Sequence, residues 1–272
     1  MNKLWLEFKP QIVFFSFMLV LFSVALNVSP VRKNTALVVP AETLEDSSVN
    51  IMIPDFGAIT DIKTKKQAFF AFLQPYIDHE NAYIANQRKA LELIEAKLLS
   101  GINLSSADKA ILVAVSKEYK LPISKTDSVE HLRQLLSRVD VIPSSLVLAQ
   151  AANESAWGTS RFARHGNNFF GQWCYTKGCG LVPSQRNLEA KHEVKRFANP
   201  ADSVHAYFMN LNTFSSYELL RQIRVELREQ NNSIDGISLT EGLSRYSERG
   251  TAYIDELQSM IYSNRLMLRD EA

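Results

Sequence analysis

The sequence predicts an α+β protein that is mainly helical and carries a small β-hairpin lobe. Apolar residues recur at helical spacing on both sides of a central stretch, residues 165–198. That stretch is rich in glycine and asparagine, contains both cysteines and has no helical periodicity. Helices that flank a hairpin insert predict a domain with a cleft between two lobes.

The first thirty residues contain a long uncharged stretch that predicts export of the chain. Residues 11–29 contain no charged side chain and follow Lys3 and Lys9. A run of this length lies between a signal-peptide core and a membrane-spanning helix. We expect an N-terminal hydrophobic helix, residues 1–30, that remains as an inner-membrane anchor, and the alternative is a cleaved signal peptide. Residues 31–62 show no sustained period and predict a linker.

A helical N-terminal extension is expected at residues 63–137. Its first helix spans residues 63–100, where Pro75 predicts a kink or a restart. Ser105 and Ser128 are cap residues that predict the starts of the next two helices.

A second domain is expected at residues 138–272. Its first helix begins near Pro143 and contains the apolar run 146–152. His192–Phe197 alternates weakly, which predicts a short hairpin. Asn199 is expected to cap a helix that starts with proline. Further helices are expected near residues 216–230, 238–246 and 253–268.

Composition and charge exclude some partners. The chain has 272 residues, 46% of them hydrophobic, which is enough for a sizeable core. Its 30 Lys and Arg against 29 Asp and Glu give a net charge of +1. Because there is no basic excess, we expect no nucleic-acid partner.

Several reaction classes lack their sequence motifs. The five histidines show no metal-ligand spacing, and the chain has no HExxH, GxSxG or phosphate-binding glycine loop. We therefore expect no metal and no organic cofactor. In an exported protein Cys174 and Cys179 are expected to form a disulfide, which also argues against a thiol nucleophile. Two free thiols are the alternative.

Glu154 is the main candidate for acid chemistry. It ends an apolar helix, four residues after Gln150, so the two side chains share a face. A carboxylate at such a place is costly unless it is paired or lies in a cleft. Desolvation there would raise its pKa and keep it protonated, as a general acid requires. The alternative is a glutamate exposed at a fraying helix end.

Other candidates could bind a sugar or complete the chemistry. The loop HGNNFFG, residues 165–171, offers amides for hydroxyl groups and aromatic faces for stacking, or else it is an ordinary turn with a hydrophobic plug. Trp157 and Trp173 could line a groove or belong to the core. Glu189 and Glu193 could oppose Glu154 as a base or nucleophile, or each could be a solvated surface charge.

Two segments carry a family resemblance. AQAANESAWGTSRFARHGNNFFG, residues 149–171, resembles the glucosaminidase domain of glycoside hydrolase family 73, which has the form AQAALESGWG followed by NNLFG. YSERGTAY, residues 246–253, looks like the segment YATDPxYxxKL of that family. The pair of motifs is specific, and either half alone would be weak.

The resemblance implies a fold, an activity and a set of residues. The fold would be lysozyme-like, and the activity that of an endo-β-N-acetylglucosaminidase, which hydrolyses the β-1,4 bond between N-acetylglucosamine and N-acetylmuramic acid. The general acid of the family falls on Glu154. The expected substrate-binding residues are Trp157, Asn167, Asn168, Phe170, Tyr246 and Tyr253.

The second catalytic group is less defined. No residue matches the second glutamate of the family cleanly, so Glu193 is expected to activate water, with Glu189 in reserve. The acetamido group of the substrate is the alternative.

These expectations describe a periplasmic monomer that binds and cuts peptidoglycan glycan strands and is tethered to the inner membrane if its N-terminal helix is uncleaved. The alternatives are a non-catalytic module that binds cell-wall glycan and a peptidoglycan amidase.

Overall fold

The structure, a computed structural model, describes residues 52–123, 128–184, 186 and 190–270. The expected N-terminal helix, most of the expected linker and Glu189 lie outside these residues. Among the helices in the described part, none combines the length and the hydrophobicity needed to cross a bilayer.

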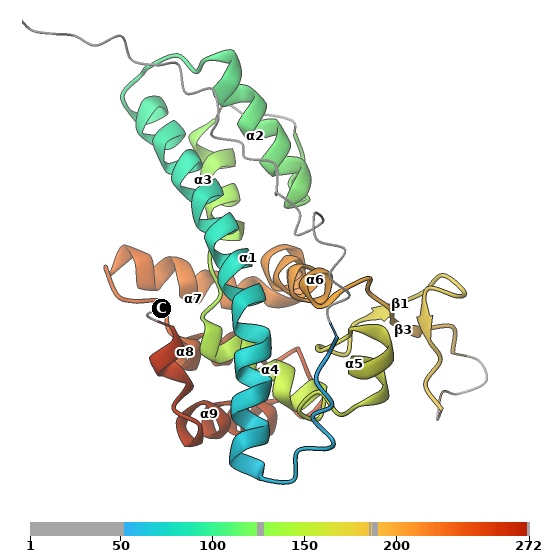
Figure 1. Cartoon of the computed structure of the whole chain (residues 1–272). Coiled ribbons are helices and arrows are strands. Elements are labelled where there is room, and N and C mark those ends of the chain that lie inside the picture. The colour runs from blue at the N-terminus through green and yellow to red at the C-terminus, as the bar shows by residue number, and fades with distance from the viewer. Residues whose placement is uncertain (1–51, 124–127, 185, 187–189, 271–272) are drawn as a thin grey trace, which may run out of the picture. The chain divides into compact units, whose positions relative to one another are not determined.

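A long helix, α1 (Ile62–Leu99), runs along the domain (Figure 1). The Asp61 side chain accepts a hydrogen bond from the backbone N–H of Thr64 and so caps its first turn. Pro75 lies inside α1, which continues through it, so the helix does not restart there, and the kink stays a prediction. Phe56, at the end of the expected linker, is buried against Phe69, so this part of the linker belongs to the core.

The next two helices, α2 (Ser106–Glu118) and α3 (Val129–Arg138), pack against α1 and against each other. Ser105 and Asp108 form a reciprocal capping box at the start of α2. Ser128 accepts a hydrogen bond from the N–H of His131 at the start of α3. Both predicted caps are confirmed.

Helix α4 (Ser144–Glu154) is the centre of the domain. Every residue from Ser144 to Ala152 is buried. It packs against α1, against α8 (Gly236–Thr240), against α9 (Thr251–Ser263) and against the short 3₁₀ helix η4 (Leu266–Arg269). This packing leaves only its C-terminal end, with Glu154, near solvent.

The lobe that follows differs from the predicted hairpin. After α5 (Arg161–Gly166), which was not expected, three short strands form an antiparallel sheet in the order β1–β3–β2 (Figure 1). The strands are β1 (Trp173–Cys174), β2 (Gly180–Leu181) and β3 (Glu193–Lys195). Six residues are too few for two strands and a turn, so the segment 192–197 provides only the central strand.

Helices return after the sheet, as expected. Asn199 caps α6 (Pro200–Thr213), and the 3₁₀ helix η2 (Ser215–Tyr217) leads into α7 (Glu218–Glu229). The helix expected near 238–246 is the shorter α8, continued by the 3₁₀ helix η3 (Glu241–Leu243). One hydrophobic cluster extends from Phe56 to Leu266. The division of the chain at residues 137 and 138 stays a prediction.

Candidate active site

Glu154 is partly buried at the last residue of α4. Its Oε1 accepts a hydrogen bond of 2.9 Å from the hydroxyl of Tyr253 on α9. A Cβ added to Gly171 would lie 3.5 Å from Oε2, so the loop after α5 passes beside the second oxygen. Burial raises the pKa of Glu154, which outweighs the lowering by the Tyr253 bond; the nearby charge of Glu256 raises it further and Arg249 lowers it. The site therefore shifts the carboxyl toward its protonated form relative to a free glutamate.

A buried hydrogen-bond chain orients this carboxyl. The hydroxyl of Tyr207 donates to Gln150 Oε1, and Gln150 Nε2 donates to the hydroxyl oxygen of Tyr253 at 3.0 Å. All three side chains are at most 1% exposed. Burial raises the pKa of both tyrosines, so both remain donors. Because Tyr253 accepts from the amide, its single proton is directed to Glu154.

Tyr246 joins the tyrosine on α9 to the loop. Its ring stacks on that of Tyr253 with centroids 5.5 Å apart and an interplanar angle of 6°. Its hydroxyl donates to the carbonyl oxygen of Phe170 at 3.2 Å. Tyr246 therefore contacts Tyr253, the residue that donates a hydrogen bond to Glu154.

The loop side chains expected to contact a sugar point inward. Asn168 is 1% exposed: its amide nitrogen donates to the carbonyls of Gln172 and Lys195, and its amide oxygen accepts from two backbone N–H groups. Asn167 donates to the carbonyls of two residues that precede α6. Phe170 is 2% exposed and stacks on Tyr207 with centroids 4.1 Å apart. These three side chains shape the loop, and the sugar contacts expected of Asn167, Asn168 and Phe170 stay a prediction.

Trp157 packs between α1 and a pocket. Its ring makes edge contacts with Phe69 and Phe70, with centroids 5.8 and 5.4 Å away, and the Lys66 ammonium lies 4.9 Å from its centroid. A pocket of about 240 Å³ lies beside it. The lining residues are Lys66, Trp157, Glu256, Ser259, Met260, Ser263 and Asn264. Trp157 therefore lines the same pocket as Glu256, which lies one turn after Tyr253 on α9.

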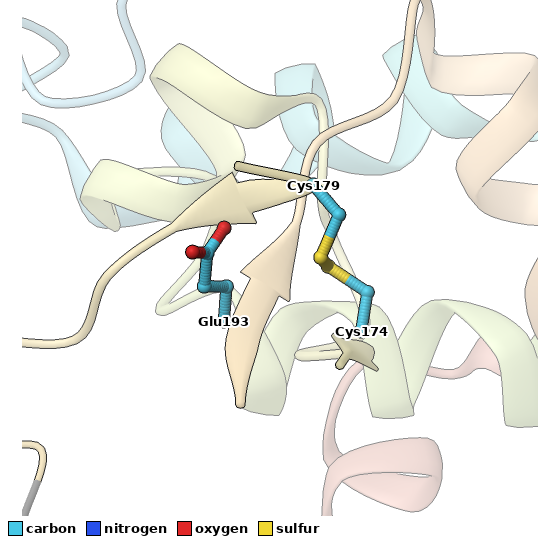
Figure 2. A group of neighbouring side chains, drawn as sticks. All are labelled: Cys174, Cys179 and Glu193. Carbon is cyan, nitrogen blue, oxygen red and sulfur yellow. A yellow bond between two sulfur atoms is a disulfide. The ribbon is translucent and has the colours of Figure 1, made fainter. Parts of the chain in front are cut away.

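Glu193, the expected second carboxylate, lies on β3 beside the disulfide (Figure 2). It is 5% exposed, and its two oxygens accept hydrogen bonds from the backbone N–H groups of Gly178, at 3.0 Å, and Gly180, at 2.8 Å. These bonds lower its pKa. Among the described residues no hydrogen bond connects Glu193 to Glu154.

The two cysteines form a disulfide beside this carboxylate (Figure 2). Cys174 and Cys179 have Cα atoms 6.3 Å apart, and their sulfurs lie within 4.8 Å of a Glu193 oxygen. Two thiolates and a carboxylate could bind a metal ion. Because the sulfurs are bonded to each other, however, they offer no thiolate ligand. The cluster is a covalent staple for the loop.

Tyr207, which sets the orientation of the Gln150 amide, was not among the predicted site residues. Gln150 itself was indicated by its position one turn before Glu154. Its partners lie 57 and 103 residues away in the chain. Tyr207 lies on α6 and Tyr253 on α9, so only the tertiary fold brings them to Gln150 on α4.

A mainly helical domain thus holds a partly buried carboxyl of raised pKa beside buried tyrosines. The family model of glucosaminidase, described as mannosyl-glycoprotein endo-beta-N-acetylglucosaminidase, matches residues 129–266. The chain belongs to the glucosaminidase family, which confirms the predicted resemblance.

Among individual proteins, the chain is similar to protein bax of Escherichia coli (strain K12). The two are 32% identical over 227 residues, which cover 84% of this chain and 80% of that protein. No solved structure gave a significant match. The lysozyme-like fold that the resemblance implies therefore stays a prediction.

Proposed function

We propose that this protein is an exported endo-β-N-acetylglucosaminidase that hydrolyses the glycan strands of peptidoglycan, with Glu154 as its general acid. The observation that carries the proposal is the partly buried carboxyl of Glu154, which burial holds toward its protonated form. A general acid must hold its proton near the working pH until the leaving group needs it. Membership of the glucosaminidase family supports the choice of a glycoside substrate.

The hydrogen bonds suggest which oxygen carries the proton. Since Oε1 of Glu154 accepts from Tyr253, the acidic proton belongs on Oε2, beside Gly171. It passes to the glycosidic oxygen as the bond between that oxygen and the anomeric carbon breaks. Glu154 then becomes a carboxylate, and the bond from Tyr253 becomes charge-assisted and stronger. Stabilisation that grows along the reaction in this way lowers the barrier.

The contacts of Glu193 bear on which group attacks the anomeric carbon, either a water that Glu193 activates or the acetamido group of the substrate. Its expected role as the base that activates water stays a prediction. Both its oxygens already accept backbone hydrogen bonds, which supports the other route, in which the acetamido group of the substrate attacks the anomeric carbon. Glu154, now a carboxylate, would then take a proton from the water that completes hydrolysis.

The aromatic residues around Glu154 would bind the sugars. Tyr246 and Tyr253 are stacked beside the carboxyl, and Trp157 lines the pocket that contains Glu256. We assign Tyr253 to the orientation of Glu154, and Tyr246 and Trp157 to the surface that meets the glycan. Asn167 and Asn168 hold the loop that brings Gly171 to the acid.

A periplasmic location accords with this substrate. The disulfide between Cys174 and Cys179 is typical of an oxidising compartment. Tethering to the inner membrane by residues 1–30 and action as a monomer are further parts of the proposal.

Product analysis tests the proposed function. The full-length chain, purified in detergent, is incubated with isolated peptidoglycan, and the soluble products are examined by mass spectrometry. We expect new reducing ends on N-acetylglucosamine. Cell wall that is bound but left uncut would instead indicate a glycan-binding module. Freed lactyl–alanine bonds would indicate an amidase.

Gly171→Ala should reduce activity because the new methyl group would stand in the path to Glu154 Oε2. Gly171 has a φ of +64° and the added Cβ would lie 3.5 Å from that oxygen. We expect a loss of roughly tenfold or more in the rate of glycan cleavage, since misplacement by about 1 Å can cost about 10²-fold.

Gly101→Ala is the matched control. Gly101 has a φ of +69°, and nothing lies within 4 Å of its added Cβ. Both variants therefore carry the same kind of backbone strain, of order 1–3 kcal/mol. If the two variants lose stability alike but cleave glycan equally well, the space beside Oε2 is not the path of the substrate.

A further inference from the structure

The sheet exposes a large aromatic surface that the proposed reaction does not use. Trp173 on β1 is 56% exposed. One face of its indole stacks on the ring of His192, with centroids 4.1 Å apart and an interplanar angle of 12°. Because one face is covered and more than half of the residue is accessible, the free surface is the opposite face and the ring edge.

Pairing between the strands fixes the direction of this ring. Trp173 lies opposite Val194, and the next pair is Cys174 with Glu193. Side chains alternate along a strand, so the indole lies on the face away from the disulfide and the carboxylate. His192 is the diagonal neighbour on the same face as Trp173, within reach of an aromatic ring.

A disulfide and two hydrogen bonds from a buried carboxylate brace the small sheet. Its strands are two or three residues long, too short to be stable alone. The disulfide from Cys174 to Cys179 closes the loop between β1 and β2, and Glu193 binds two backbone N–H groups of the same segment. Since Trp173 is the residue before this staple, the bracing holds an exposed indole in one orientation. Such pre-organisation is typical of a binding surface.

The backbone of Trp173 also lies close to the loop that passes beside the candidate acid. Trp173 follows Gly171 by two residues, so their Cα atoms are at most about 7 Å apart. Gly171 passes beside Glu154 Oε2. The carbonyl of the intervening Gln172 accepts bonds from Asn168 and from the N–H of Lys195, which fixes the connection. Trp173 is therefore joined to the loop beside Glu154 by a short connection of fixed geometry.

We propose that Trp173, backed by His192, is a sugar-binding subsite that takes the apolar face of an N-acetylhexosamine ring next to the bond cut at Glu154. This inference rests on the proposed function, because it names a contact of the same glycan strand. The C–H groups on one face of a sugar ring carry partial positive charge, and they complement the negative face of an indole. Glu193 acts here as a brace for the platform.

Binding without turnover tests the subsite. Full-length chain that carries Glu154→Gln is titrated with a soluble N-acetylglucosamine tetramer by calorimetry. Adding Trp173→Ala should weaken binding roughly tenfold, the factor that corresponds to one stacking contact of about 1.4 kcal/mol. Trp173→Leu, which still covers His192 but has no aromatic face, should show the same loss, and Trp173→Phe should keep most of the affinity.

Phe214→Ala is the matched control, because Phe214 is 51% exposed but lies between α6 and α7. It should bind like the parent. The subsite is refuted if the parent does not bind the tetramer, if Trp173→Ala or Trp173→Leu binds as tightly as the parent, or if Phe214→Ala is equally impaired. The two proposals fail separately: an uncut cell wall with Trp173-dependent binding contradicts only the hydrolase, and cleavage with Trp173-independent binding contradicts only the subsite.

Discussion

Replacing Glu154 by glutamine should lower the rate of peptidoglycan cleavage by about 10²–10⁴-fold, the usual loss when a general acid is removed. Glutamine has nearly the same shape, and its amide oxygen can still accept the hydrogen bond from Tyr253. It has no acidic proton to give to the leaving oxygen. Release of reducing ends by the wild type and the variant, at equal folded concentration, measures the effect.

Glu193→Gln provides the comparison. If Glu193 activates water, Glu193→Gln should lower the rate of peptidoglycan cleavage as much as Glu154→Gln does. If it braces the cysteine loop, glutamine still accepts from one of the two glycine N–H groups, and the loss should be far smaller. Activity of Glu154→Gln within a few-fold of the wild type would remove Glu154 from the mechanism.

Asp140→Asn should cause the largest loss of stability, about 3–5 kcal/mol in the free energy of unfolding, as expected when one partner of a buried ion pair is removed. Asp140 is 2% exposed and binds Arg228 through both oxygens at 2.6 Å, and Arg88 lies 3.1 Å away. Arg224, fully buried, donates to the backbone carbonyl of Asp140. The neutral variant would leave buried guanidinium charge without its counter-ion.

The stability difference should also depend on pH. Burial raises the pKa of Asp140, but the hydrogen bond from Arg228 and the charges of Arg224 and Arg88 outweigh it and hold the pKa below 3.8. The ionised carboxyl therefore stabilises the fold at neutral pH, and this contribution is lost as the pH falls below 3.8. The difference in the free energy of unfolding between wild type and Asp140→Asn should therefore become smaller at acid pH.

Denaturant unfolding of Asp140→Asn is compared with that of Glu92→Gln. Glu92 pairs with the same Arg88 at 2.8 Å, but its side chain is 49% exposed, so its loss should stay below about 1 kcal/mol. If both substitutions lower the free energy of unfolding equally, the buried ion pairs of Asp140 contribute no more to stability than an exposed pair.

Local features of the fold were predictable from the sequence. Ser105, Ser128 and Asn199 begin helices because each satisfies a backbone N–H three residues further along. Such caps depend only on neighbours in the chain. The carboxyl at the end of an apolar helix was recognisable for the same reason, since the burial of α4 follows from its composition.

Features that depend on distant partners were not predictable. The hydrogen bond from the Asn168 amide to the carbonyl of Lys195 on β3 is one of these features, since the two residues are 27 positions apart. The sequence could not show that Glu193 accepts hydrogen bonds from Gly178 and Gly180, because backbone N–H groups offer no side-chain signal. The single hairpin was wrong because strand pairing connects β3 with segments on both sides of the disulfide.

The most direct test of the account is the titration of the Glu154 carboxyl itself. In protein labelled with ¹³C at the glutamate side-chain carboxyl carbon, the resonance that disappears in Glu154→Gln belongs to this residue. We predict a titration midpoint above the ordinary value of 4.5, and a still higher midpoint in Tyr253→Phe, which lacks the bond that lowers the pKa. A midpoint at or below 4.5 would contradict the proposal that Glu154 is held protonated as the acid.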